Sequence, residues 1–106
     1  MIEIVEYSDE SARCPFGRWF DRLNPEAAAW VVTALTRIEE DGNFGDSKSV
    51  GSGVQELRIH KGPGYRVYYA LDGDTLVILL GGGTKRQQQK DIDKAQSSWT
   101  DYKRRK

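Results

Sequence analysis

Three strand-like segments follow one another in the second half of the chain. They cover residues 54–60, 65–71 and 75–80. The residues between them, Gly62-Pro63-Gly64 and Asp72-Gly73-Asp74, are of the types that favour tight turns. We therefore expect consecutive antiparallel hairpins. The last segment is apolar on both faces, which predicts that it lies inside the sheet and not at its edge.

The first half of the chain has one short strand pattern at residues 2–7 and then two helical patterns. Apolar residues at helical spacing predict a first helix, namely Phe16, Trp19, Phe20 and Leu23. Asn24-Pro25-Glu26 is a helix-start signal, because asparagine caps free amides and proline suits the first helical position. The second helix is expected to run to Asp41 and to end at Gly42. Its inward residues are Ala27, Val31, Ala34, Leu35 and Ile38.

A last helix is indicated by a stripe made of Ile92, Ala95, Trp99 and Tyr102. The predicted order is β-α-α-β-β-β-α, in one α+β domain over residues 1–106. A small antiparallel sheet is expected to pack against a helical hairpin, with the helices on one face. Residues 42–53 are predicted to be a long connection without a strand, of the kind that is either functional or poorly ordered.

Composition excludes several classes of protein. The one cysteine, Cys14, has no disulfide partner within the chain and none at metal-ligand spacing. The longest apolar run, residues 76–80, is far too short to cross a bilayer. Glu3 and Glu6 stand where a secretory signal would carry basic and apolar residues. A cytoplasmic protein that needs no metal or cofactor is expected.

Charge is distributed unevenly along the chain, although it sums to zero. Residues 1–57 hold five basic and eleven acidic residues, whereas residues 84–106 hold eight basic and three acidic ones. This asymmetry indicates either a face that meets a polyanion or a basic tail that aids solubility, since residues 103–106 are all basic.

A cluster of polar side chains is predicted on one sheet face. In the segment 54–60, Leu57 and Ile59 point to the core and the residues between them point away. If the next connection has an odd number of residues, Arg66 lies across from Arg58 or His60. The face away from the helices would then expose Arg58, His60, Arg66 and Tyr68. Two opposed cations indicate an anion between them, or a solvated face that Glu56 neutralises.

The run Gly81-Gly82-Gly83-Thr84-Lys85-Arg86 is not a P-loop, because no glycine directly precedes the lysine. The glycines are expected to end the strand and to bring Lys85 and Arg86 to the sheet edge. His60 is the only histidine, and no visible partner makes it a metal ligand or part of a catalytic triad.

Taken together, these segments resemble the RelE/ParE toxin superfamily, and most closely its HigB-like branch of phage-related "addiction module killer" proteins. The resemblance rests on residues 53–59, 62–69 and 79–85, with Asp91-Ile92 and Ala95. It extends to the Trp19-Phe20 helix and the residues 43–46. The family fold is a small antiparallel sheet backed by a helical hairpin, similar to the fold expected above.

The resemblance implies the toxin of a type II toxin–antitoxin pair, one that cuts messenger RNA on the ribosome without a metal. In this chemistry a 2′-hydroxyl attacks the adjacent phosphodiester. By position, Arg66 is similar to the arginine at the scissile phosphate. Arg58 resembles a basic residue on the preceding strand, and Lys85 or Arg86 one after the last strand. The resemblance leaves His60, Tyr68 and Asp91 as candidates for the acid and base. The further RNA-binding candidates are Lys48, Lys61, Tyr68 and Arg86.

Two other functions stay open: a ParE-like inhibitor of DNA gyrase that cuts nothing, and an inactive phage-derived homologue. The resemblance also implies a helix-turn-helix antitoxin, through which alone this chain would meet DNA. That partner could cover the basic sheet face or dock on the helical side. An acidic surface made of Asp21, Glu26, Glu39 and Glu40 favours the helical side.

Overall fold

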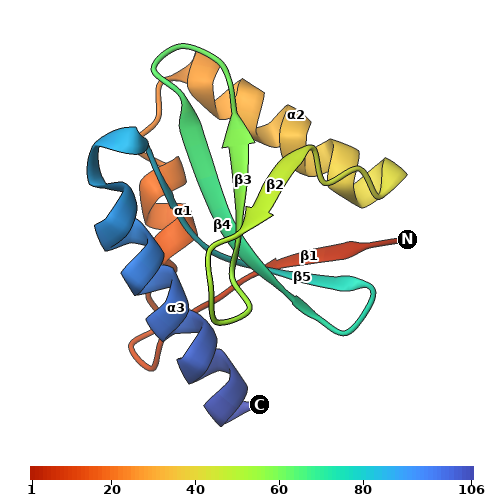
Figure 1. The fold of residues 1–106 in the computed structure, drawn as a ribbon, viewed down its shortest axis with the longest axis vertical. Coiled ribbons are helices and arrows are strands. Elements are labelled where there is room, and N and C mark those ends of the chain that lie inside the picture. The colour runs from red at the N-terminus through yellow and green to blue at the C-terminus, as the bar shows by residue number, and fades with distance from the viewer.

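A computed structural model describes residues 1–106. The protein folds into a five-stranded sheet with helices on both faces (Figure 1). In chain order the elements are β1 (Glu3–Glu6), α1 (Pro15–Phe20), α2 (Pro25–Asp41), β2 (Asp46–Ser49), β3 (Gln55–Ile59), β4 (Tyr65–Asp72), β5 (Leu76–Gly83), the short 3-10 helix η1 (Lys85–Gln87) and α3 (Gln88–Arg105). The sheet order is β1-β5-β4-β3-β2. The predicted α+β class is confirmed.

The limits of α2 follow from local sequence, as predicted. The Asn24 side chain accepts a hydrogen bond of 2.9 Å from the Ala27 amide, and Pro25 is the first helical residue. Gly42 ends the helix with a φ of 64°, and its amide bonds back to the last turn. None of the helices combines the length and the apolar content that a bilayer span requires.

The hairpins β3–β4 and β4–β5 are antiparallel, and β5 lies between β1 and β4, both as predicted. The expectation of a wholly antiparallel sheet is wrong, because β1 pairs with β5 in parallel. The chain crosses the sheet face through α1 and α2 between β1 and the other strands, and a helical crossover permits parallel pairing.

The expectation of a strandless connection at residues 42–53 is also wrong. Residues 46–49 form β2, which pairs antiparallel with β3 at the sheet edge. The sequence Asp-Ser-Lys-Ser carries no apolar pattern, and the strand depends instead on its ladder to β3. A hydrogen bond of 2.9 Å from the Tyr69 hydroxyl to Ser47 Oγ also holds it.

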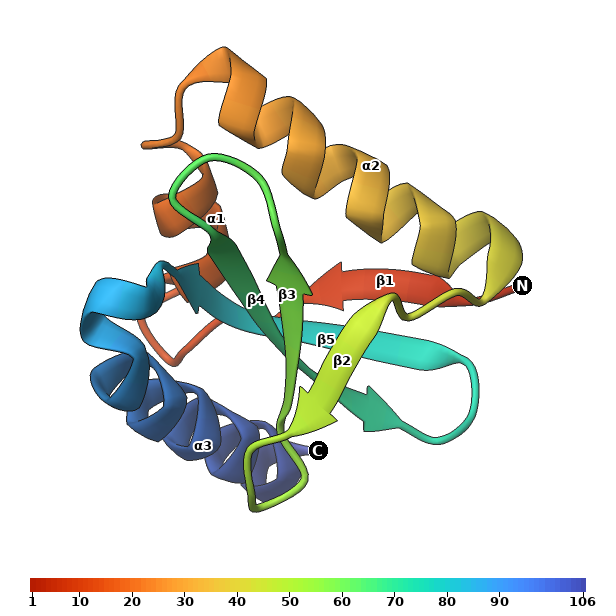
Figure 2. The ribbon, with the colours of Figure 1, turned by 45° about the horizontal axis from the view of Figure 1, so that its top comes forward.

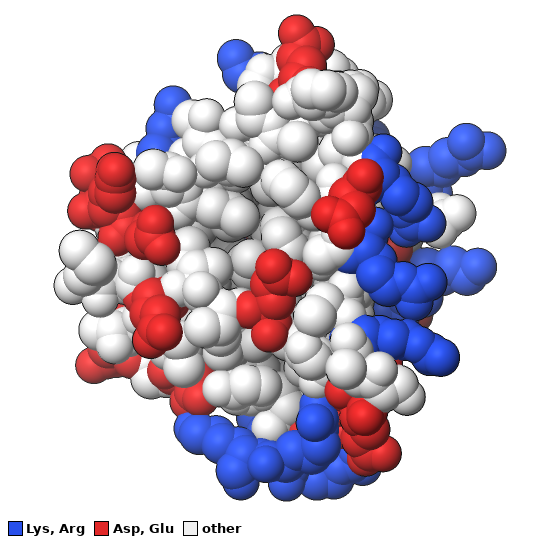
Figure 3. Space-filling model, turned by 180° about the vertical axis from the view of Figure 1, so that it is seen from behind, with Lys and Arg blue, Asp and Glu red and all other residues white.

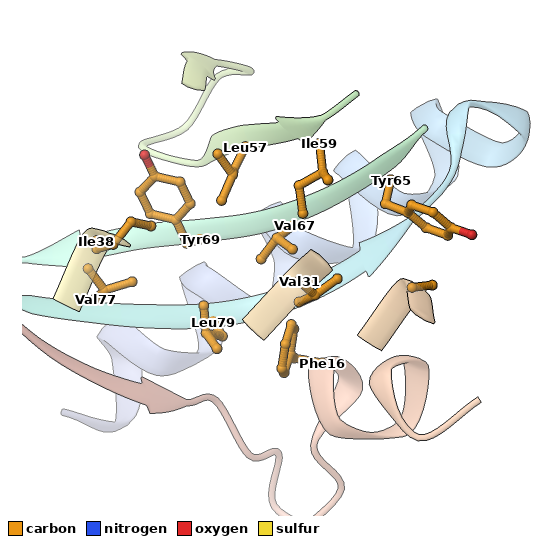
Figure 4. Packing of buried hydrophobic residues seen from close by; sticks show 11 residues of the cluster. Phe16, Val31, Ile38, Leu57, Ile59, Tyr65, Val67, Tyr69, Val77 and Leu79 are labelled. Atoms are coloured by element: carbon orange, nitrogen blue, oxygen red, sulfur yellow. The ribbon is translucent and has the colours of Figure 1, made fainter. Parts of the chain in front are cut away.

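Helices cover both faces of the sheet, which corrects the prediction of a single covered face. Figure 2 shows α2 on one side of the sheet and α3 on the other. The core beneath α1 and α2 includes Phe16, Val31, Leu57 and Val67 (Figure 4). The core beneath α3 is formed by Tyr7, Val54, Tyr68, Ala70, Ile78, Leu80, Ile92, Ala95 and Trp99. The second sheet face is itself apolar, so α3 must cover it.

The three glycines do not end β5; they continue it to Gly83, opposite Arg66. Their role is to let helices approach the strand. A Cβ atom on Gly82 would collide with the Trp19 ring of α1, and one on Gly83 would collide with the Asp91 carboxylate of α3. The register shifts between Tyr68 and Tyr69, which marks a bulge where the glycines begin.

Candidate active site

Arg58 of β3 and Arg66 of β4 lie directly opposite each other, which is one of the two pairings of Arg66, with Arg58 or with His60, that the sequence allows. The connection between their strands has the odd length that this register requires, residues 60–64. Both side chains point to the α3 face. They are not on an open surface, because the first residues of α3 cover part of that face: 30% of the Arg58 side chain and 13% of the Arg66 side chain are exposed.

Glu56 supplies the anion between the two arginines. Its side chain is fully buried, with Oε1 3.5 Å from Arg58 Nε and Oε2 3.6 Å from Arg66 Nε. Tyr68 Oη and Gln88 Nε2 donate hydrogen bonds of 3.1 and 2.8 Å to Oε2. A buried carboxylate needs such partners, because removing its charge from water without them costs roughly several kcal/mol. Glu56 therefore fixes both guanidinium groups from inside the protein.

The outer ends of the two guanidinium groups remain available. In both ion pairs Nε makes the closest approach to Glu56, and neither arginine takes part in a hydrogen bond with the protein. A guanidinium presents several N–H donors in a planar fork that matches the oxygens of a phosphate. Two such forks, held side by side, form a site suited to one phosphodiester.

Two carboxylates lie at the ends of the row that contains this pair. The strand registers place Asp46, Arg58, Arg66 and Gly83 next to one another across β2, β3, β4 and β5. The Asp91 carboxylate occupies the space above Gly83. Burial raises the pKa of Asp91, and Lys94 and Lys90 offset part of that rise. Asp91 is therefore a carboxyl group that holds its proton more tightly than an ordinary aspartate.

His60 lies at the Asp46 end of the row. Its Nε2 is 2.6 Å from Asp46 Oδ2, and 70% of the His60 side chain is exposed. The hydrogen bond with His60 lowers the pKa of Asp46, and the charge of Arg58 adds to this effect. The imidazole is thus oriented by a carboxylate and accessible to a ligand, which is the arrangement that a general acid or base requires.

The remaining predicted residues are dispersed around this group. Lys85 and Arg86 are exposed in η1, the short helix that precedes the Gln88 that contacts Glu56. Lys48 is exposed on β2 opposite Glu56, and Lys61 is exposed beside His60.

The prediction that Tyr68 is exposed is wrong. Its side chain is fully buried beneath α3 and donates to Glu56, and burial together with the Glu56 charge raises its pKa far above the ordinary value. A hydroxyl so enclosed supports Glu56 and does not reach RNA.

Sequence reasoning missed the supporting side chains of the site. The sequence pattern predicts Glu56 only as a neutralising charge on a solvated face, whereas it is the buried centre of the cluster. No local pattern indicates Gln88, because it meets Glu56 from 32 residues away in the sequence. No group of three His, Cys, Asp or Glu side chains could hold a metal ion.

Comparison with known proteins identifies relatives of this chain. Residues 18–100 match the family model described as phage-derived protein Gp49-like (DUF891). The chain is 46% identical over 80 residues to an uncharacterized protein of Haemophilus influenzae, a match that covers 76% of this chain and 81% of that relative. Since the family model takes in most of the chain, this protein belongs to the Gp49-like family of phage-derived proteins, a toxin-like family of the type II toxin–antitoxin kind.

Proposed function

We propose that this protein is the toxin of a type II toxin–antitoxin pair and that it cuts messenger RNA on the ribosome. One observation carries the proposal: Arg58 and Arg66 are opposed across two strands, Glu56 holds their Nε atoms, and their outer nitrogens have no protein partner. A buried anion that orients two cations outward is well suited to bind a phosphodiester and to stabilise the additional negative charge of its transition state.

The proposed reaction is an internal transesterification. The 2′-oxygen attacks the adjacent phosphorus, the bond from phosphorus to the 5′-oxygen breaks, and a cyclic phosphate and a 5′-hydroxyl result. A base takes the proton of the 2′-hydroxyl, and an acid gives a proton to the leaving 5′-oxygen. No metal enters this scheme, since the arginines balance the phosphate charge.

The acid and the base are proposed to be His60 and Asp91. They lie beyond opposite ends of the Arg58–Arg66 pair, His60 through its contact with Asp46 and Asp91 above Gly83. Asp46 and Gly83 are three strand spacings apart, roughly 14 Å, so at least one of the two groups is proposed to transfer its proton through a water molecule. The raised pKa of Asp91 favours it as the acid, and His60 then acts as the base. Lys85 and Arg86, exposed before α3, would bind flanking phosphates, and Lys48 and Lys61 would extend this binding surface.

The proposed partners follow from this activity. A toxin that stops translation in the cytoplasm must be held inactive, so we expect an antitoxin of the helix-turn-helix type. Contact with DNA would then occur only through the antitoxin. The acidic end of α2 and the basic candidate active site offer two surfaces of opposite charge on which this antitoxin could dock.

Induction of the chain in cells tests the proposal. Protein synthesis, measured by amino-acid incorporation, should stop within minutes, and primer extension should reveal new 5′-ends within translated messages. The matched variant Arg58→Lys/Arg66→Lys keeps both charges beside Glu56 but lacks the planar forks, so it should weaken both effects strongly while it remains folded by circular dichroism. A DNA-damage response without RNA cleavage would indicate a gyrase inhibitor. Normal growth with abundant folded protein would indicate an inactive homologue.

A further inference from the structure

A second charged site lies beyond Asp91. It is a cleft of about 430 Å³ between α1, the end of β5 and α3. Four cationic side chains line it, namely Arg13, Arg18, Arg22 and Lys94. Figure 3 shows Lys and Arg side chains gathered along the side of the molecule where α1 and α3 lie, with acidic side chains more frequent on the opposite side.

The cationic groups of the cleft are free to bind a ligand. The four residues are absent from the ion pairs of the structure. Two carboxylates also line the cleft. Asp9 is occupied locally, since its Oδ1 accepts hydrogen bonds of 2.8 and 3.0 Å from the amides of Ser11 and Arg13. The second carboxylate belongs to Asp91, which lines this cleft as well as the end of the Arg58–Arg66 row.

The floor of the cleft suits an extended polymer. Gly81 and Gly82 form part of it. The Trp19 ring covers Gly82, whereas no atom lies within 4 Å of the position that a Cβ on Gly81 would take. A ligand backbone can therefore approach the strand closely. The half-buried Trp19 ring lines the same cleft. A basic groove with an aromatic side chain is the arrangement by which proteins bind single-stranded nucleic acid, through phosphate contacts and base stacking.

We infer that this cleft binds the single-stranded RNA next to the bond that is cut. For the direction in which the RNA runs, the inference rests on the proposed function, because Asp91 is shared by the candidate active site and the cleft. A phosphate at Arg58 and Arg66 would be followed by nucleotides that pass Asp91 and enter the cleft. Arg18, Arg22 and Lys94 then contact successive phosphates, and Trp19 stacks on a base. An acidic peptide would match the charge but would make no use of the aromatic ring beside the glycine floor.

Binding of a 2′-O-methyl RNA 12-mer, followed by fluorescence anisotropy over a range of salt concentrations, tests the inference. This probe lacks the attacking hydroxyl, so it stays intact with the wild-type chain. Arg18→Gln/Arg22→Gln should weaken binding by roughly tenfold or more. The plot of log K against log salt concentration should become less steep by about 1.4, since each phosphate contact to a single strand contributes about 0.7 to its steepness. Trp19→Leu should weaken binding without changing this slope.

The control is Lys103→Gln/Arg104→Gln, which removes the same charge from exposed positions on α3 outside the cleft. It should bind the 12-mer as the wild type does. Equal losses in the two double variants, or no binding by the wild type, would overturn the inference. So would tighter binding of a glutamate-rich peptide than of the RNA at equal salt, which would indicate an acidic protein partner.

The test separates this inference from the proposed function. If the wild type binds the 12-mer through Arg18 and Arg22 yet cuts no RNA in cells, the cleft is an RNA site and the proposed activity fails. If RNA is cut in cells while the cleft variants bind and cut normally, the activity stands and the cleft is not part of the RNA path.

Discussion

Glu56 is fully buried against Arg66, with its Oε2 atom 3.6 Å from Arg66 Nε, on a sheet face where sequence patterning predicts a solvated surface. The same carboxylate lies 3.5 Å from Arg58 Nε through its other oxygen. This relationship turns two mutually repelling cations into a fixed pair.

Glu56→Gln should destabilise the protein by about 3 kcal/mol, because it leaves two opposed arginines without their buried counter-ion. Urea unfolding measures the change. Sulfate should restore part of the lost stability, since it can bind between the two guanidinium groups, and it should do so more strongly than in the wild type. A variant as stable as the wild type in the absence of sulfate would contradict the role assigned to Glu56.

Arg66→Ala should reduce RNA cleavage by about 10²–10³, the usual cost of losing one donor to a developing negative charge. It should also lower the Tm, because Glu56 loses one of its two cations. Arg66→Lys separates the two effects. It keeps a charge beside Glu56 and hence most of the stability, but it lacks the planar fork, so cleavage should recover only in part. Full activity in Arg66→Lys would mean that the fork is not needed.

Gly83→Ala should destabilise the fold by about 1–3 kcal/mol, because the new methyl group takes the space of the Asp91 carboxylate. The neighbouring Gly81→Ala is a matched control, since its methyl group meets no atom within 4 Å. The control should change the free energy of unfolding by less than about 0.5 kcal/mol. Equal effects of the two substitutions in urea unfolding would show that only the loss of glycine flexibility matters.

Asp91→Asn should make the protein more stable at neutral pH and less active. Burial raises the folded-state pKa of Asp91 above its unfolded value, so the folded state binds the proton more tightly. The resulting stability is present below the unfolded pKa and is lost as pH rises through the folded pKa. Asparagine cannot ionise, so Asp91→Asn avoids this loss of stability at neutral pH.

Urea midpoints of the wild type and Asp91→Asn should accordingly differ at pH 7 and converge near pH 3, about a unit below the ordinary pKa of aspartate. Asp93→Asn, at an exposed position on α3, is the control and should match the wild type at both values. A constant offset between Asp91→Asn and the wild type at the two pH values would rule out the buried charge as its cause.

Glu39→Lys/Glu40→Lys should slow association with a basic antitoxin surface and weaken the salt dependence of the association rate. Both residues are exposed near the end of α2, on the helical side of the molecule. Stopped-flow kinetics with the purified antitoxin gives the rates. Unchanged rates, together with a large effect of Arg58→Glu, would instead locate the antitoxin on the candidate active site.

Local sequence was sufficient for much of the fold. Asn24 and Pro25 start α2 and Gly42 ends it, because capping and the left-handed conformation depend on residues within one turn. The turns of the β3–β5 hairpins and the odd connection at residues 60–64 determine the register. For this reason the sequence pattern narrows the partner of Arg66 to Arg58 or His60, and the structure selects Arg58.

Other features depend on residues that are distant in the chain. The short polar strand β2 forms only because β3 offers it an edge, and β1 joins the sheet in parallel only after two helices have crossed its face. Which face α3 covers is decided by the apolar side chains beneath it, among them Tyr68 and Ile78.

The sequence alone thus determined most of the individual elements, the order of the hairpins and the placement of Arg66 near Arg58 and His60, because each depends on the chemistry of near neighbours. Only the tertiary structure decided that α3 closes over that face, that Glu56 and Gln88 meet there, and that Asp91 lies above Gly83. Burial is a collective property of the packed chain, and it turns a row of charged residues on a strand into a preorganised site.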